Sequence, residues 1–241
     1  MIEKFKIKND KTQINLNISS KVFYPTETTK YLLEATIKKI SKKKNLVILD
    51  LGCGNGVIGI FLLKKFKHIK HITFSDLSLN AVNVTKKNLR LNKISLKKYE
   101  VIQSNQFDNL NQKKFDLIIN DVSGISSDVA KITSWFKNVP CDSGNDGTKL
   151  TLSILKNFSN YLRKNGSLIF PIISFSNENK VLKLIKKLKL NYKYLSVNSW
   201  PVPKVLYKNI KKLNKLKKDK KIYFEVKYNF ILANTKILFV K

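Results

Sequence analysis

Cysteine, histidine and arginine are scarce in this chain of 241 residues, and each shortage excludes a class of site. The two cysteines, Cys53 and Cys141, lie far apart and form no Cys-x-x-Cys pair. The two histidines, His68 and His71, lie in a basic stretch without nearby acidic ligands. We therefore expect neither a disulfide framework nor a bound metal.

Long hydrophobic runs are also missing. No segment approaches the roughly 20 consecutive apolar residues that cross a bilayer, and the first residues, MIEKFKIKNDK, lack the apolar centre of a secretion signal. We therefore expect a cytoplasmic protein that does not bind membranes. Because 43% of the residues are hydrophobic, the chain can bury a full core, and its length suits one domain with additions.

Acidic residues are few as well: 16 stand against 47 lysines and arginines, which gives a net charge of +31. This excess suggests phosphate neutralisation by a nucleic-acid-binding protein. However, only Arg90 and Arg163 are arginines, whereas phosphate and base recognition favours the planar arginine fork. A genome-wide bias towards lysine and asparagine gives the same composition, so solvated lysine faces are the alternative. The densest cluster, residues 208–221 (KNIKKLNKLKKDKK), is the candidate surface for RNA or an acidic partner.

What the chain does contain is an alternation of short apolar runs and helical patterns. The run NLVILDL is continuous, which is typical of a strand buried on both faces, and a glycine loop and the helical VIGIFLLKKF follow it. Alternation of this kind predicts an α/β fold, namely a Rossmann-like, doubly wound and mostly parallel sheet with its ligand at the carboxyl ends of the strands. Strands are predicted at residues 45–51, 71–76, 99–105, 115–121 and 166–175, and helices at 28–40, 57–66, 78–92, 147–163 and 178–190.

The two ends of the chain carry different patterns. EKFKIK and QINLNI, joined by the turn NDK, predict a short N-terminal β-hairpin. After a strand at 192–200 and a basic helical stretch, a C-terminal antiparallel hairpin is predicted between residues 221–232 and 235–240. We expect residues 1–21 to form a hairpin extension and residues 22–241 to form the main domain.

The glycine loop is the first candidate site. Gly54, Gly56 and Gly59 form the Gly-x-Gly-x-x-Gly pattern of a dinucleotide site, and Asp76 at the end of the second strand is placed to bind ribose hydroxyls. However, Asp50 precedes the loop, where a carboxylate repels a pyrophosphate and favours a cationic or amino-acid-like ligand. A sulfonium ion that also carries an ammonium group fits better. The alternatives are that Asp50 caps the loop and that Gly59 permits close packing of helix on sheet.

LDLGCGNG (residues 49–56), followed by SDLS (75–78), resembles the first two motifs of class I S-adenosylmethionine-dependent methyltransferases. The resemblance extends from Val22 to about Phe175 and implies that residues 22–241 are a methyltransferase domain. It also implies that Gly52, Gly54 and Gly56 pass under the methionine part of S-adenosylmethionine, that Asp76 holds the ribose and that Leu77 packs on the adenine.

The segment VFYPTETTKYLLEA (residues 22–35) is similar to the one that precedes the core in HemK-like glutamine methyltransferases. The similarity places four residues near the cofactor: Tyr24, Pro25, Glu27 and Thr29. The alternative is that Thr26 or Thr28 simply caps a helix. After the third strand, Asn105 replaces the acid that relatives use to accept the adenine amino hydrogen, which its carbonyl oxygen can still do.

NDVSG (residues 120–124) departs from the Asn-Pro-Pro-aromatic motif that HemK-like enzymes carry after the fourth strand. There, the asparagine oxygen and the following carbonyl hold a planar amide or amine towards the methyl group. Here Asn120 remains, while Asp121, Val122 and Ser123 replace the prolines and the aromatic residue. We expect Asn120 to position the nucleophile and Asp121 either to remove its proton or to orient it, the alternative being that Asp121 caps the next turn.

These residues predict an S-adenosylmethionine-dependent methyltransferase that methylates a nitrogen of a protein side chain, of the glutamine type, or of an RNA base. Two alternatives remain open at this point. One is a small-molecule N- or O-methyltransferase, and the other is a non-catalytic nucleic-acid-binding protein that retains the cofactor pocket.

Overall fold

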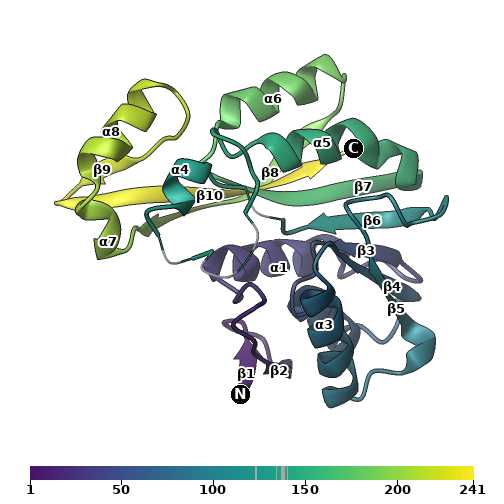
Figure 1. Ribbon diagram of the computed structural model, residues 1–241. Coiled ribbons are helices and arrows are strands. Elements are labelled where there is room, and N and C mark those ends of the chain that lie inside the picture. Colours follow the sequence, from purple (N-terminus) through teal and green to yellow (C-terminus); the bar gives the residue numbers. More distant parts are fainter. Residues whose placement is uncertain (123, 134, 137–138, 140) are drawn as a thin grey trace. The chain divides into compact units, whose positions relative to one another are not determined.

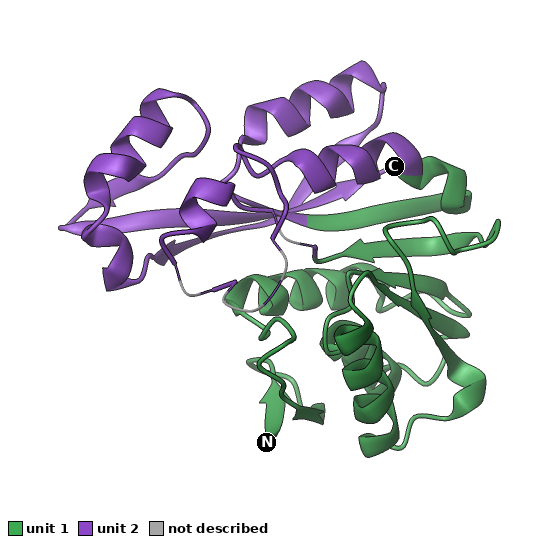
Figure 2. Ribbon diagram, viewed as in Figure 1, with its two compact units in different colours: residues 1–121, 158–170 green, residues 122–157, 171–241 purple. Residues whose placement is uncertain are grey.

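The computed structural model describes residues 1–122, 124–133, 135–136, 139 and 141–241. The chain forms two compact units. Unit 1 contains Met1–Asp121 and Phe158–Phe170, and unit 2 contains Val122–Asn157 and Pro171–Lys241 (Figure 2). The division at residues 21 and 22 that the sequence suggests stays a prediction.

A parallel sheet forms the centre of unit 1, in the strand order β5-β4-β3-β6-β7. The apolar runs become its strands because both faces are covered, and in β3 every residue after Val47 is buried. The register sets Leu51 beside both Ser75 and Asn120, so the ends of three strands meet at one edge. The strands are β3 (Val47–Leu51), β4 (His71–Asp76), β5 (Tyr99–Gln103), β6 (Phe115–Asn120) and β7 (Leu162–Ile173), the last of which continues into unit 2.

Three helices and the N-terminal hairpin complete unit 1 (Figure 1). The helices are α1 (Glu27–Ile40), α2 (Val57–Lys65) and α3 (Leu79–Leu91), and the hairpin strands are β1 (Ile2–Lys6) and β2 (Gln13–Asn17). Side-chain amides tie β2 to the end of α3: Asn17 N donates to Asn88 Oδ1 at 2.6 Å, and Asn15 N donates to Asn92 Oδ1 at 2.9 Å. Short 3-10 turns lie at η1 (Leu96–Lys98) and η2 (Phe158–Tyr161).

Unit 2 is built around the long strand β10, which pairs antiparallel with β8 and with the short β9. A buried apolar cluster that includes Phe175, Leu206 and Leu213 holds helices α4, α7 and α8 to β10. Its elements are α4 (Ser127–Ala130), α5 (Lys149–Asn157), α6 (Glu178–Lys187), β8 (Tyr192–Pro201), α7 (Lys204–Tyr207), α8 (Ile210–Lys218), β9 (Glu225–Lys227) and β10 (Phe230–Val240).

The predicted α/β fold, with its mostly parallel sheet and two hairpins, is confirmed, but two boundaries were wrong. The C-terminal hairpin turns at Tyr228 and Asn229, and β10 then runs without a break through Ala233 and Asn234, because the pairing with Trp200 and Ser199 of β8 continues there. The helix predicted at 147–163 ends earlier, since the chain after η2 already pairs with β6.

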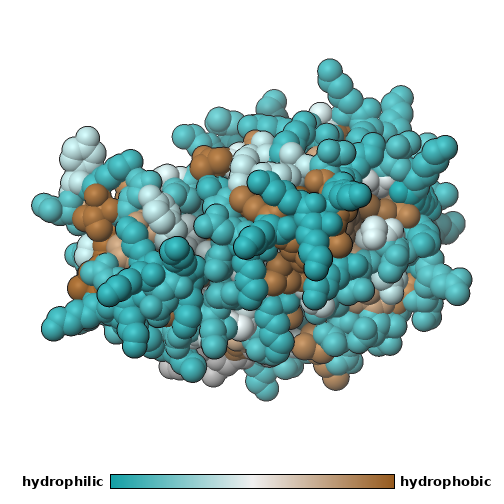
Figure 3. Space-filling view, turned by 90° about the horizontal axis from the view of Figure 1, so that it is seen from above, coloured by the Kyte–Doolittle hydropathy of each residue, from teal (hydrophilic) through white to brown (hydrophobic). Residues whose placement is uncertain are grey.

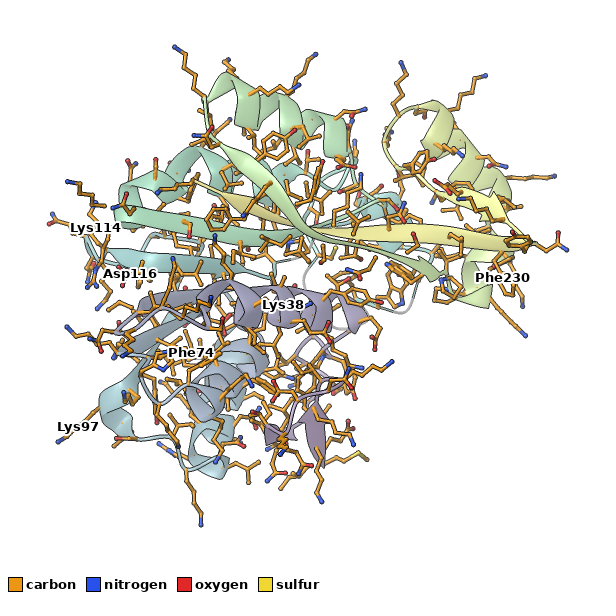
Figure 4. The ribbon with its side chains drawn as sticks, turned by 180° about the vertical axis from the view of Figure 1, so that it is seen from behind. Lys38, Phe74, Lys97, Lys114, Asp116 and Phe230 are labelled. Atoms are coloured by element: carbon orange, nitrogen blue, oxygen red, sulfur yellow. The ribbon has the colours of Figure 1, made fainter. Side chains whose placement is uncertain are left out.

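The surface agrees with the lysine-rich composition. Hydrophilic side chains cover most of the face drawn in Figure 3, and apolar side chains appear there in separate areas. Lys97 and Lys114 lie at the periphery of unit 1, whereas the ring of Phe74 is fully buried (Figure 4). None of the described helices has the length and apolar character that a bilayer crossing needs, and the described residues include no cluster of three or more potential metal ligands.

Candidate functional site

The glycine loop between β3 and α2 has a backbone that only glycine adopts easily. Gly52, Gly54 and Gly56 have φ values of 72°, 57° and 79°, in the left-handed region. Gly52 N donates to Ser75 O at 2.8 Å, which fixes the start of the loop against β4. A Cβ atom on Gly54 would meet no atom within 4 Å, so this part of the loop faces open space. The loop therefore leaves room for a ligand close to its backbone.

Asp76, at the end of β4, ties this loop in place. Its Oδ2 accepts a hydrogen bond from Gly54 N at 2.9 Å, and its Oδ1 accepts one from Ser78 N at 2.9 Å. Burial raises the pKa of Asp76, although these hydrogen bonds act in the opposite direction. The next residue, Leu77, is 59% exposed. An acid and an exposed apolar side chain thus stand together beside the glycine loop, as a ribose and an adenine would need.

Asp50 lies under the loop and is almost completely buried. Its Oδ2 accepts a hydrogen bond from Gly59 N in α2 at 2.9 Å, whereas its Oδ1 has no partner within the described residues. Burial, with smaller contributions from the charges of Asp121 and Asp76, raises its pKa to about 7. One oxygen therefore accepts a backbone N–H in the first turn of α2, and the other remains for a donor or a positive charge.

Gly59 has the packing role that was the alternative for it. A Cβ atom at this position would lie 2.3 Å from the ring of Phe74 and 3.0 Å from Asp50 Oδ2. Only a residue without a side chain lets α2 come this close to β4. Gly59 therefore places the start of α2, and with it the loop, against the sheet.

Asn120 and Asp121 lie at the end of β6, beside the start of the glycine loop. Asn120 is buried and pairs in register with Leu51, the residue before Gly52. Asp121 N donates to Leu51 O at 3.2 Å. Because both motifs follow neighbouring parallel strands, the structure brings the predicted acceptor residues next to the predicted cofactor loop. Ser123 of the same motif lies outside the described residues.

The carboxylate of Asp121 is held by the first turn of α1. Thr29 Oγ1 donates to Asp121 Oδ2 at 2.8 Å, and Thr29 is itself buried. Removal of the carboxylate from water raises the pKa of Asp121 to about 7, although the hydrogen bond from Thr29 acts in the opposite direction. Thr29 also accepts a hydrogen bond from Thr26 N at 3.4 Å, so Thr26 is the helix cap. Nothing in the sequence indicated this pairing, because the two partners are 92 residues apart.

Two further predicted cofactor residues lie at exposed positions. The side chain of Tyr24 is 54% exposed, and its hydroxyl donates to Glu3 Oε2 of β1 at 2.7 Å. Asn105 is exposed on the loop that follows β5. Their assignment to the cofactor and to the adenine stays a prediction.

When ionised, the three acids Asp50, Asp76 and Asp121 give the site a negative field. All have a raised pKa, and the charges of Asp76 and Asp121 act on Asp50. None of them takes part in an ion pair with another described residue, in a chain that is otherwise crowded with lysine. Such a field favours a cationic ligand over a pyrophosphate. A sulfonium with an ammonium group, as in S-adenosylmethionine, fits these residues.

Comparison with known proteins identifies a family and similar methyltransferases. Residues 26–121 match the family model "Methyltransferase small domain". A putative protein N5-glutamine methyltransferase from Methanocaldococcus jannaschii is 30% identical over 176 residues, which are 73% of this chain and 84% of that protein. A bifunctional methyltransferase from Rickettsia typhi is 32% identical over 152 residues, which are 61% of this chain and 28% of that protein.

Among solved structures, the Thermus thermophilus 16S rRNA N2 G1207 methyltransferase, in complex with AdoMet and guanosine, resembles this chain with a TM-score of 0.62. The match covers 100% of this chain and 50% of that one at 15% identity, so it supports the fold. Together, the match to the archaeal relative over most of its length, the family model and the glycine loop confirm the predicted family. The chain belongs to the methyltransferase small-domain family and is a class I S-adenosylmethionine-dependent methyltransferase of the HemK-like group.

Proposed function

We propose that this protein transfers the methyl group of S-adenosylmethionine to the side-chain amide nitrogen of a glutamine in a protein substrate. The observation that carries the proposal is the position of Asn120, which lies in register with Leu51 at the mouth of the glycine loop. The cofactor brings a methyl carbon already activated by the sulfonium, so the protein supplies mainly alignment. The name of the archaeal relative, a putative protein N5-glutamine methyltransferase, supports this acceptor.

The roles divide between two sets of residues in this proposal. Asn120 and Asp121 act on the acceptor: the Asn120 side-chain oxygen accepts an amide hydrogen, and Asp121 accepts the proton that the nitrogen loses on methylation. The other set holds the cofactor, with Tyr24 and Asn105 at its periphery: Asp50, Gly52, Gly54, Gly56, Asp76, Leu77 and Thr29. Thr29 also supports the acceptor set, because its hydroxyl donates a hydrogen bond to Asp121.

One observation favours a second kind of acceptor. Asp121 stands where glutamine methyltransferases of this group carry a proline, and a carboxylate there suits an amine or a hydroxyl that must lose a proton. The names of the relatives do not favour a small-molecule acceptor or a non-catalytic protein. Binding of nucleic acid through residues 208–221 is a separate matter, and it stays a prediction from charge.

The acceptor can be identified with S-adenosylmethionine labelled in its methyl group. The protein is incubated with fractionated cell extract, and label is expected in a band that protease removes and ribonuclease leaves. Acid hydrolysis of the labelled protein should release methylamine, because the methyl group then sits on an amide nitrogen. Label that is lost with ribonuclease, or that remains in small molecules, would contradict a protein acceptor; label released as methanol would indicate methylation of an oxygen.

Replacing Asp76 by alanine should weaken binding of S-adenosylmethionine by about 1.5–3 kcal/mol, the usual scale for a hydrogen bond to a charged group. The same change frees Gly54 N and Ser78 N, so the loop loses its tie as well. Titration calorimetry measures the affinity, and Asp108→Ala, which removes an exposed acid on the same unit, is the control. Tight binding of NAD, without binding of S-adenosylmethionine, would overturn the cofactor assignment.

A further inference from the structure

The tip of the β9–β10 hairpin carries a tyrosine whose side chain contributes little to packing. Lys227 pairs with Phe230, so the turn consists of Tyr228 and Asn229 alone, with φ values of 49° and 62°. Two-residue turns with positive φ at both positions favour Asn-Gly, and a bulky residue is strained there. Tyr228 is also 94% exposed, so it gains almost nothing from burial. Among the described non-glycine residues with positive φ, Tyr228 is the only aromatic one, and its exposed ring is available for an interaction.

Other large apolar side chains in residues 223–230 are also exposed. Val226 is 61% exposed, Phe230 is 55% exposed and Tyr223 is 48% exposed. Phe230 lies at the end of β10 in Figure 4, opposite Lys227 in the pairing of the two strands. Tyr223 precedes β9, and because successive residues of a strand face opposite sides, Phe230 and Lys227 lie on one face of the hairpin and Val226 on the other.

Helix α8 packs against the base of the same hairpin and turns its lysines outward. Leu213 and Leu216 share the buried cluster with Phe224 and Ile231. Lys217 joins the two elements: its Nζ donates to Phe224 O at 2.7 Å and lies 5.2 Å from the centre of the Tyr223 ring. The exposed lysines of α8 and its approach are Lys208, Lys211, Lys212, Lys215 and Lys218.

The charge of this region exceeds the lysine background of the chain. Residues 204–230 contain ten lysines and two acids, Asp219 and Glu225, which is more than twice the average density of net charge. Glu225 is paired with Lys227 at 2.7 Å. A uniform compositional bias does not concentrate charge beside exposed aromatic rings.

We propose that the β9–β10 hairpin and the lysine face of α8 together form a binding surface for single-stranded RNA. Such surfaces combine cationic side chains that follow the phosphates with aromatic rings on which bases stack. An acidic peptide would use the lysines but not the strained ring of Tyr228. The region has no arginine, so bidentate base recognition is absent from it, and binding should tolerate changes of sequence.

The test uses the 241-residue chain and a fluorescent single-stranded RNA of mixed sequence, with affinity measured by anisotropy over a range of salt. Tyr228→Asn should lower the affinity about tenfold with the salt dependence unchanged. This variant should fold at least as well as the parent, because asparagine suits the positive φ of the turn. Lys208→Gln, Lys211→Gln and Lys215→Gln combined should reduce the slope of log affinity against log salt by about 2.

The matched control removes three exposed lysines from unit 1, as Lys38→Gln, Lys43→Gln and Lys97→Gln. It should retain most of the affinity and of the slope. An equal loss in this control, or a flat salt response of the parent, would show that the lysines act only as background charge and would overturn the proposal. Tighter binding to polyglutamate, or to vesicles of anionic lipid, than to RNA would overturn it as well.

Discussion

Replacing Asp121 by asparagine should lower the rate of methyl transfer by about 10²–10⁴, because the variant keeps the shape of the side chain and loses the base. The pKa of Asp121 is raised to about 7, and a base works only when ionised. The rate of the parent should therefore fall as the pH drops below about 7, and this acidic limb should be missing from the variant. The rate is measured at saturating cofactor between pH 5.5 and 9.

Two further measurements separate this loss from unfolding and from cofactor binding. Burial makes the ionised form of Asp121 costly, so its contribution to stability is present below pH 4 and is lost as the pH rises through about 7. At pH 8 the neutral asparagine should thus leave the melting temperature unchanged or higher. Asp50, whose pKa is also raised to about 7, should show its titration in the affinity for S-adenosylmethionine instead of the rate.

Thr29→Val tests the hydrogen bond that holds Asp121. Its hydroxyl lowers the pKa of Asp121, so removing it should move the acidic limb of the rate to higher pH. A purely structural role of Thr29 would lower stability without moving this limb. If the Asp121→Asn variant methylates the true acceptor at the full rate and keeps the acidic limb of its pH profile, Asp121 is an orienting or capping residue and not a base.

Asn120→Ala should reduce turnover about 10²-fold or more, while the affinity for S-adenosylmethionine changes little. The substitution removes the group that aligns the acceptor nitrogen and leaves the glycine loop and Asp76 in place. Single-turnover rates and calorimetry on the same preparation separate the two effects. A loss of cofactor affinity as large as the loss of turnover would assign Asn120 to the cofactor, and an unchanged rate would place the acceptor elsewhere.

The core of the fold could be predicted because its signals are local. The apolar run at residues 46–49 indicates a buried strand, and Gly52, Gly54 and Gly56 occupy left-handed backbone angles that glycine adopts most easily. The arrangement of neighbouring parallel strands then follows from connection rules, which is why Asn120 could be placed beside the glycine loop.

The parts that were missed depend on side chains distant in sequence. Thr29 donates a hydrogen bond to Asp121, which is 92 residues away in the sequence, and Asn88 accepts one from the backbone of Asn17, which is 71 residues away. Hydrogen bonds of this kind leave no periodic pattern in either segment. The turn at Tyr228 was missed for another reason. Two-residue turns with positive φ at both positions favour Asn-Gly, and this turn has Tyr-Asn.

The hydrogen bond between Gly54 and Asp76 also bears on how the enzyme releases its demethylated product after each reaction. Because the protein's own carboxylate holds Gly54 N, the loop is fixed by contacts within the chain, and little ordering entropy should be lost when a nucleoside binds. The demethylated product carries the same adenosine and amino-acid parts, so the preformed loop should retain it almost as well. The distinction then falls to Asp50, Asp76 and Asp121, whose attraction weakens when the sulfonium charge disappears. Product inhibition in this enzyme should therefore be governed by charge instead of shape.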